Sequence, residues 1–433
     1  MSTIELTDAP QRAFLFGTDR AENRLWGQQP LEELGRLAET AGAQVAGRAV
    51  QHIRVIDPHT YIGRGKAGEI GSQIQELGAQ LAVFDDELSP GQAGHLEEVF
   101  GVQVLDRSEL ILDIFARHAR TSQARLQVEL AQLEYLLPRL KRMWVHLSRI
   151  RGGIGLRGPG EKQIETDRRI IQRRISLLHK KLEKISRQHS VRLKSRRGLM
   201  VFSLVGYTNA GKSSLLNGLT GSRVPVRDQL FSTLDTTTRK LELPGGREVL
   251  ATDTVGFISR LPHHLVASFK ATLEEVREAD HLLVVADVSN PHFQERLQVV
   301  DRVLAEIGAE DLERTYVFNK VDRVEDRQSL SEVAEQYPDH VFTSAVGKGP
   351  ALRHLVERMT RVVEQCETEF SVDLGPGEGR LAAAFHRLGC VVERRSSDKL
   401  LSLRVRMRKS QLDRLLSDIP YNGQITFHGG NLD

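Results

Sequence analysis

The sequence VFSLVGYTNAGKSSLL, residues 201–216, matches G-x-x-x-x-G-K-[ST] between an apolar, strand-like run and a helical pattern. This context predicts a phosphate-binding loop at the end of a strand, although a glycine turn could match by accident. Backbone N–H groups of such a loop and of the helix N-terminus surround a polyphosphate. We expect Lys212 to reach the β- and γ-phosphates and the Ser213 hydroxyl to bind Mg2+. The loop consists of Gly206, Tyr207, Thr208, Asn209, Ala210, Gly211, Lys212 and Ser213.

Two further segments are placed to sense a γ-phosphate. The first, which we name switch I, lies about twenty residues after the loop and contains Phe231, Ser232, Thr233, Leu234 and Asp235. Thr233 is a candidate Mg2+ ligand, with Thr236, Thr237 and Thr238 as alternatives at this stage. The second is Asp253-Thr254-Val255-Gly256, which follows a predicted strand over 248–252. Asp253 is expected to hold Mg2+ through water, and the Gly256 N–H to contact the γ-phosphate.

A fourth motif predicts that the base is guanine. Asn319-Lys320-Val321-Asp322 follows a predicted strand over 314–318. The Asp322 carboxylate can accept hydrogen bonds from guanine N1–H and the 2-amino group, a pair that adenine does not offer. We expect Lys320 to cover the base and Asn319 to brace the loop. Later in the chain lie Ser344, Ala345 and Val346, where the Ala345 N–H is a candidate for guanine O6. Four motifs in order at strand ends predict GTP or GDP with Mg2+.

Phe257 follows the second γ-phosphate segment directly. Many signalling GTPases have a glutamine there, which orients the attacking water. A phenyl ring cannot hydrogen-bond water, so the catalytic group is unknown beyond phosphate stabilisation by Lys212. We predict slow hydrolysis by the chain alone and acceleration by a partner. The alternative is that Phe257 merely packs and another side chain positions the water.

Composition describes an ordinary soluble protein of several domains. The 433 residues are 27% charged and 40% apolar, and they include two cysteines, Cys366 and Cys390. Few cysteines indicate a reducing compartment, and no apolar run is long enough for a membrane helix. We expect a cytoplasmic monomer of the α/β class with four parts. These are an N-terminal parallel α/β domain (1–112), an antiparallel helical hairpin (113–197), a P-loop GTPase domain (198–367) and an α+β module (368–433).

Positive charge is concentrated in the predicted hairpin. Residues 139–197 contain 19 Lys/Arg against 4 Asp/Glu, a net charge of +15. Leucines and other apolar residues recur every three or four positions over 126–147 and 171–185, and Pro138 is expected to kink the first helix. The glycine-rich link formally matches G-x-G-x-x-G, but it follows a helix and not a strand, so a dinucleotide site is rejected. RNA phosphate is the expected partner, and a solvated charged surface is the alternative. The candidate RNA contacts are Arg151, Gly152, Gly153, Gly155, Arg157, Gly158, Arg168 and Arg169.

The two ends of the chain give weaker patterns. Residues 1–30 show no clear periodicity. Helices are expected over 31–38 and 67–77, strands over 51–56, 81–84 and 102–105, and a glycine turn over 63–66. In the last module we expect a helix over 377–388, strands over 390–394 and 400–407, and a helix capped by Ser410.

Together these features resemble the HflX family of translational GTPases. The resemblance rests on residues 61–66, on the glycine tip Gly152-Gly153-Ile154-Gly155 with Gly158-Pro159-Gly160-Glu161, and on residues 167–169. It continues through the phosphate loop with its Tyr207-Thr208-Asn209 and through residues 231–235, 253–257 and 261–263. It selects Thr233 as the second Mg2+ ligand. Thr236 and Ser214 depart mildly from the family pattern, and Thr236 is expected to loosen switch I.

The resemblance also implies a partner. Members of the family bind the large ribosomal subunit, with the hairpin tip near the peptidyl transferase centre. They split stalled or idle ribosomes in the GTP-bound form, and the ribosome stimulates hydrolysis. A subunit-assembly GTPase and a regulatory switch with a protein effector and no RNA are the alternatives. The basic hairpin argues against the last.

Overall fold

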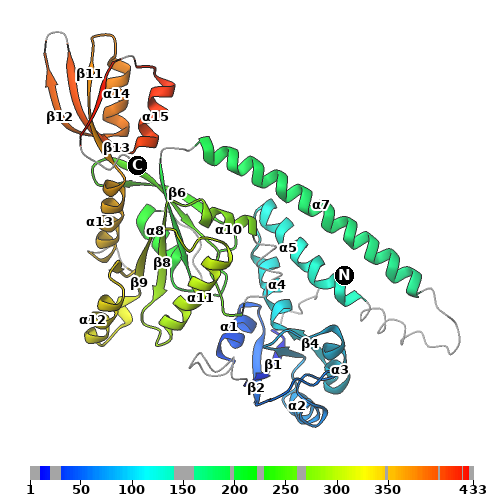
Figure 1. Cartoon of the computed structure of the whole chain (residues 1–433). Helices are drawn as coiled ribbons and strands as arrows, with labels where there is room; N and C mark the ends of the chain where they lie inside the picture. The colour runs from blue at the N-terminus through cyan, green and yellow to red at the C-terminus, as the bar shows by residue number, and fades with distance from the viewer. Residues whose placement is uncertain are drawn as a thin grey trace.

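The computed structural model describes residues 10–19, 31–140, 160–195, 199–221, 229–260, 270–346, 350–397, 400–421 and 423–428. Three sheets and a pair of long helices organise these residues (Figure 1). Two of the sheets lie at opposite ends of the molecule, with the sheet that carries the phosphate loop between them. In this part of the chain no helix combines the length and hydropathy that a membrane span requires.

The N-terminal unit is a four-stranded parallel sheet of order β2-β1-β3-β4 with four helices. Its elements are β1 (Arg12–Thr18), α1 (Glu32–Thr40), β2 (Gln44–Gln51), α2 (Arg64–Glu76), β3 (Leu81–Phe84), α3 (Pro90–Phe100), β4 (Gln103–Asp106) and α4 (Arg107–His118). The predicted parallel α/β class is confirmed. Ser89 begins α3 with a capping box to Gln92, and Asp106 caps α4.

Three details of that prediction were wrong. β1 was missed because it is buried on both faces and therefore shows no polar alternation. The strand expected over 51–56 is instead β2, which ends at Gln51; Val55 and Ile56 are 83% and 37% exposed, so their apolar character reflects no burial. The glycine turn is shorter than expected, because Gly63 has a φ of 84° and α2 begins at Arg64.

The helical hairpin joins the N-terminal unit to the sheet with the phosphate loop. It contains α5 (Ser122–Leu136), a 3₁₀ turn over Leu137–Arg139 that includes Pro138, and α7 (Gly160–Ser195). Leu130 and Leu133 of α5 pack against Leu178 and Leu182 of α7, which confirms the predicted helix pair. The 36 residues of α7 span about 54 Å at the usual helical rise. Of the predicted glycine tip, 151–161, residues 151–159 lie outside the described residues, and Gly160 and Glu161 begin α7.

The nucleotide unit has a six-stranded sheet of order β10-β9-β8-β5-β7-β6, in which β6 alone is antiparallel to its neighbour. Its strands are β5 (Met200–Gly206), β6 (Thr237–Leu243), β7 (Arg247–Asp253), β8 (His281–Asp287), β9 (Arg314–Asn319) and β10 (His340–Phe342). Its helices are α8 (Lys212–Thr220), α10 (Lys270–Arg277), α11 (Phe293–Glu306), the 3₁₀ turn Val321–Arg323, α12 (Arg327–Gln336) and α13 (Pro350–Gln365). Because β5, β7, β9 and β10 run parallel, the motifs at their carboxyl ends meet at one edge.

The C-terminal unit follows a β-α-β-β-α-β order with an antiparallel sheet, β12-β13-β11-β14, as in ferredoxin-like folds. Its elements are β11 (Thr368–Leu374), α14 (Gly379–Leu388), β12 (Cys390–Ser396), β13 (Leu401–Met407), α15 (Lys409–Asp418) and β14 (Ile425–His428). The α+β prediction is confirmed, although β11 and β14 were missed. Ser410 is not the cap expected, because α15 begins at Lys409, with Arg408 at the capping position.

Candidate functional site

The phosphate loop requires both of its glycines. Gly206 ends β5 with a φ of 152°, and a Cβ there would lie 2.2 Å from the Val285 carbonyl oxygen of β8. Gly211 has a φ of 96°, and a Cβ there would lie 2.2 Å from Asn319 Nδ2. Any side chain would therefore push the loop away from the neighbouring strands. The two glycines are therefore required by the short distances between the loop and β8 and Asn319, as well as by the backbone conformation of the turn.

Lys212 begins α8 and is 6% exposed. Its Nζ donates to the carbonyl oxygens of Gly206 (3.1 Å) and Tyr207 (3.0 Å). Burial lowers the pKa of Lys212 to about 8, while the charge of Asp253 opposes that shift. Burial likewise raises the pKa of Asp253, with Lys212 and the hydroxyl of Ser213 opposing. The ammonium thus lies inside the loop, ready to exchange carbonyl partners for phosphate oxygens.

A pocket of mixed polarity opens above the loop. Residues of all three phosphate-sensing segments line it: Thr208, Asn209, Gly211, Lys212, Ser213, Ser214, Phe231, Ser232, Thr233, Thr254 and Gly256. The structure therefore brings together segments that are separated by up to fifty residues. Two predicted members of switch I turn elsewhere. Leu234 is 2% exposed in the core, and the Asp235 carboxylate faces the N-terminus of α5.

Three oxygens converge at one side of this pocket. Ser213 Oγ lies 2.6 Å from Thr233 Oγ1 and 2.5 Å from Asp253 Oδ2. Hydroxyl and carboxylate oxygens are the donors that Mg2+ prefers. Two of the three competing threonines have other partners: Thr236 donates to Glu275 of α10 (2.8 Å), and Thr238 contacts Thr252 of the neighbouring strand (3.0 Å). Thr236 is thus tied to α10, and the expected loosening of switch I stays a prediction.

Phe257 adds a short bridge between the loop and the second γ-phosphate segment. Its N–H donates to the Gly206 carbonyl (3.0 Å), and its carbonyl accepts from the Thr208 N–H (2.7 Å). The ring is 2% exposed and belongs to the core. A Cβ on Gly256 would lie 2.9 Å from Thr208 Cα, so this glycine packs directly on the loop. The Phe257 side chain therefore packs in the core, and the group that positions the attacking water stays a prediction.

The base-reading segment is braced by Asn319, which is 1% exposed. Its Nδ2 donates to the Ala210 carbonyl (2.8 Å), and its Oδ1 accepts from the Ala345 N–H (3.1 Å). The Ala345 N–H expected at guanine O6 is thus engaged by Asn319 in this structure. Lys320 Nζ donates to the Asn209 carbonyl (2.9 Å) and pairs with Asp287 (2.7 Å).

The carboxylate expected to read guanine lies at the outer end of this segment. Asp322 is exposed and accepts a hydrogen bond from the Ser344 hydroxyl. Val321 begins a 3₁₀ turn, and Val346 is 78% exposed. The Asp322 side chain can therefore meet a base that approaches from solvent.

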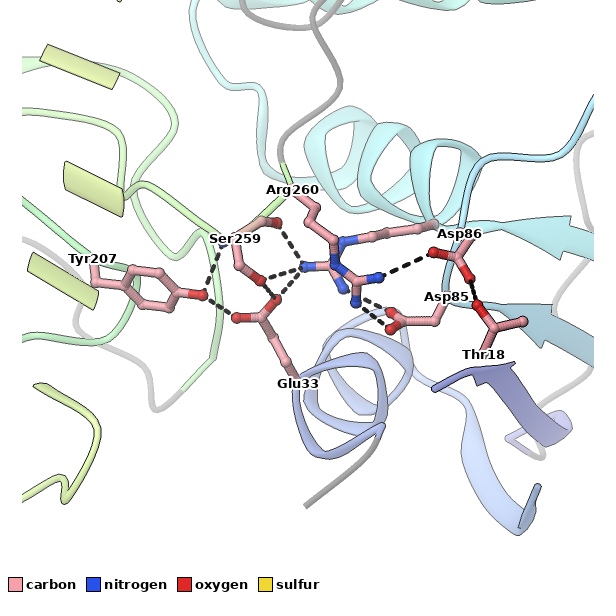
Figure 2. Close-up of polar contacts among 8 residues, drawn as sticks. Thr18, Glu33, Asp85, Asp86, Tyr207, Ser259 and Arg260 are labelled. Atoms are coloured by element: carbon pink, nitrogen blue, oxygen red, sulfur yellow. Dashed lines mark hydrogen bonds and ion pairs between the residues drawn. The ribbon is translucent and has the colours of Figure 1, made fainter. Parts of the chain in front are cut away.

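Sequence reasoning missed a cluster of polar residues beside the loop. Tyr207 leaves the loop toward the N-terminal unit, where its hydroxyl meets Glu33 of α1 (Figure 2). Ser259 and Arg260 follow Phe257 and contact the same unit. No local pattern marks these residues, because Glu33 and Ser259 are 226 positions apart.

Of the candidate RNA contacts, the structure describes only Arg168 and Arg169. Arg168 and Arg169 are exposed on α7, and Arg169 pairs with Glu165 one turn away (3.3 Å). The others, between Arg151 and Gly158, lie outside the described residues.

Three features define a P-loop GTP-binding protein. They are the six-stranded sheet, the phosphate loop after β5 and the N-K-x-D turn after β9. Three family models match in order: a GTP-binding GTPase N-terminal region (28–116), a GTP-binding GTPase middle region (118–196) and a 50S ribosome-binding GTPase (201–320).

Curated relatives match nearly the full length. GTPase HflX of Magnetococcus marinus is 41% identical over 97% of this chain and 98% of its own. GTPase HflX of Escherichia coli strain K12 is 42% identical over 88% and 90% of the two chains. Among solved structures, the chain is similar to a GTP-binding protein from Sulfolobus solfataricus in complex with GDP. The two sequences are 26% identical, the TM-score is 0.44, and the match covers 81% of this chain and 98% of that one. The chain belongs to the GTPase HflX family.

Proposed function

We propose that this GTPase binds the large ribosomal subunit in its GTP form, separates stalled or idle ribosomes into subunits, and leaves after hydrolysis. The observation that carries the proposal is the attachment of the basic hairpin to the GTP site. Asp235 of switch I accepts hydrogen bonds from the N–H groups of Arg120 (3.0 Å) and Thr121 (3.1 Å) at the start of α5. The match of residues 201–320 to a 50S ribosome-binding GTPase supports the same partner.

The site residues receive the following roles in this proposal. Lys212 and the loop N–H groups bind the phosphates, and Asp322 selects guanine with Asn319 bracing the loop. Ser213 and Thr233 would hold Mg2+ directly, and Asp253 would hold it through water. The ion would neutralise charge between the β- and γ-phosphates when bound.

Hydrolysis is proposed to be slow until the ribosome binds. Phe257 is 2% exposed and offers no group that can hydrogen-bond an attacking water. A partner must therefore supply a group or move one into place. Single-turnover hydrolysis with and without large subunits measures this, and fast hydrolysis by the chain alone would contradict it.

The hairpin is proposed to be the RNA-binding arm. On α7 the basic side chains Arg168, Arg173, Lys180, Lys181 and Lys184 are exposed, while Leu178 and Leu182 pack against α5. An extended basic surface suits a phosphate backbone, and its binding should weaken with salt. We place the tip, with Arg151 and Arg157, near the peptidyl transferase centre on the family resemblance.

Sedimentation of ribosomes through sucrose gradients tests the proposal. With this chain and a non-hydrolysable GTP analogue, intact ribosomes should decrease and free subunits increase, with the chain on the large subunit. Binding to precursor particles alone would favour an assembly factor. Absence from every ribosomal fraction would favour a switch with a protein effector.

Deleting Gly152–Gly160 tests the role of the arm separately from that of the GTP site. The deletion should leave GTP affinity unchanged and abolish splitting. Lys212→Ala is the converse control, because it should lose nucleotide binding with the arm intact. Full splitting by the deletion variant would exclude the tip from the mechanism.

A further inference from the structure

The N-terminal unit contacts the GTP site at three places that sense the nucleotide. These are Tyr207 in the phosphate loop, switch I, and the segment 253–260, which we name switch II. Figure 2 shows the contacts of Tyr207 and of switch II, where Glu33, Asp85 and Asp86 of the N-terminal unit meet Tyr207, Ser259 and Arg260. Thr18 donates a hydrogen bond to Asp86 (2.7 Å).

Glu33 is the centre of this cluster. Its carboxylate accepts hydrogen bonds from the Tyr207 hydroxyl, from Ser259 Oγ (2.6 Å) and from Arg107. The Tyr207 hydroxyl in turn accepts from the Ser259 N–H (2.8 Å). One carboxylate of the N-terminal unit therefore joins Tyr207 of the phosphate loop to Ser259 of switch II. These two segments are also joined by the backbone hydrogen bonds of Phe257.

Buried charge holds Glu33 in place. The Arg107 side chain is 3% exposed and pairs with Glu33 and with Asp85 (2.8 Å), and it also donates to the Ser259 carbonyl (2.9 Å). Burial works to raise the pKa of Glu33, but Arg107, Ser259 and Tyr207 outweigh it and hold the pKa below its ordinary value. Glu33 is therefore ionised at neutral pH, and because its side chain is 13% exposed and that of Arg107 is 3% exposed, little water can take the place of this carboxylate.

Switch II is anchored a second time through Arg260. Its guanidinium pairs with Asp85 and with Asp86 (3.2 Å) of the N-terminal unit. Arg260 has a φ of 49°, in the left-handed region that side chains other than glycine disfavour. Such a conformation persists where surrounding contacts impose it.

Switch I is held by the same unit and by the base of the hairpin. Phe231 packs edge-on against Phe115 of α4, with ring centroids 4.7 Å apart, and the Leu230 N–H donates to Thr40 Oγ1 (3.3 Å). Phe231 also has a positive φ, 55°. Both switches thus carry one disfavoured backbone conformation at the point where they contact the N-terminal unit.

We propose that Glu33 is a positioning residue for the GTP site: by joining Tyr207 to Ser259 it couples docking of the N-terminal unit to binding of the γ-phosphate. The coupling follows from position along the chain. Gly256 lies three residues before Ser259, and Thr233 lies two residues after Phe231. In the docked structure Thr233 already lies 2.6 Å from Ser213 Oγ.

Reciprocity makes the coupling measurable from the nucleotide side. If docking favours the switch arrangement that a triphosphate requires, undocking must weaken triphosphate binding by the same factor. A diphosphate lacks the γ-phosphate that Gly256 and Thr233 would contact, so its affinity should not depend on docking. The inference rests on those proposed roles of Gly256 and Thr233, and it does not involve the ribosome.

Glu33→Gln in the full chain tests the proposal, with Glu32→Gln as the matched control. Glu32 is the preceding residue of α1, and its carboxylate pairs with Arg36 on the same helix (2.9 Å). The measurement is the Kd of a non-hydrolysable GTP analogue and of GDP by titration calorimetry. Glu33→Gln should weaken the analogue about fivefold or more and leave GDP within about twofold. Glu32→Gln should change neither.

Tyr207→Phe provides a second variant that keeps the ring and removes the hydroxyl. It should weaken the analogue selectively as well, and it decides the question if Glu33→Gln does not fold. An equal change for both nucleotides, no change, or tighter binding of the analogue would overturn the proposal. Failure of the unmodified chain to bind either nucleotide would instead refute the proposed GTP-site roles.

Discussion

Raising the pH above 8 should weaken GTP binding because Lys212 then loses its proton in the free chain. Burial lowers the pKa of this ammonium from 10.5 to about 8. In the complex, phosphate oxygens would surround Nζ and favour the charged form, which raises the pKa again. Binding above pH 8 must therefore be accompanied by uptake of a proton, and its affinity falls as protons become scarce.

The size of the effect follows from that pKa of about 8. At pH 7 nearly all free chains carry the charged lysine, whereas at pH 9 about one in eleven does. The Kd for GTP should therefore rise about tenfold between pH 7 and pH 9, which corresponds to roughly 1.4 kcal/mol.

Folding stability should change in the opposite sense. The unfolded chain holds this proton up to the ordinary lysine pKa, so between pH 8 and about 10.5 the unfolded state binds more protons than the folded one. The contribution of Lys212 to the free energy of unfolding then rises with pH in that window, by about 3 kcal/mol at most.

Titration calorimetry at half-unit steps from pH 6.5 to pH 9.5 measures the binding prediction. Lys212→Arg is the control, because a guanidinium does not lose its proton in this range and the pH dependence should disappear even if affinity falls. Guanosine, which lacks phosphate, corrects for titration of the base. An affinity for GTP that stays constant through pH 9 in the unmodified chain would refute the reasoning.

Three further substitutions test separate parts of the structure. Asn319→Ala removes the buried bonds to Ala210 and Ala345 and should lower the free energy of unfolding by about 2–4 kcal/mol, measured by denaturant titration; a loss below about 0.5 kcal/mol would show that the brace is dispensable. Asp322→Asn should shift nucleotide preference from guanine toward xanthine in competition binding, and retained guanine selectivity would remove Asp322 from base reading. Leu178→Ala, at a fully buried position between α5 and α7, should cost about 2–5 kcal/mol locally. The expected result is faster hydrogen exchange along α7 with unchanged GTP affinity. If protection from exchange along α7 and GTP affinity fell together, the hairpin and the GTP site would unfold as one unit.

The arrangement of the candidate nucleotide site could be predicted from the sequence because its determinants are local. A phosphate loop, a γ-phosphate segment and a base-reading turn each need a few consecutive residues after a strand. Parallel strands then bring their carboxyl ends together without further information. The converging oxygens of Ser213, Thr233 and Asp253, and the brace by Asn319, follow from that arrangement. The hairpin was predictable for the same reason, since its leucines repeat at helical spacing.

Contacts between distant segments were decided by the tertiary structure. β1 carries no alternation because both of its faces are covered, so its place in the centre of the N-terminal sheet depends on neighbours from elsewhere in the chain. Asp235 was grouped with the nucleotide ligands by its motif, yet packing turns it to the start of α5. Glu33 and Tyr207 are 174 positions apart. The role of the Glu33 carboxylate depends on Arg107, Tyr207 and Ser259, which only the folded chain brings to it.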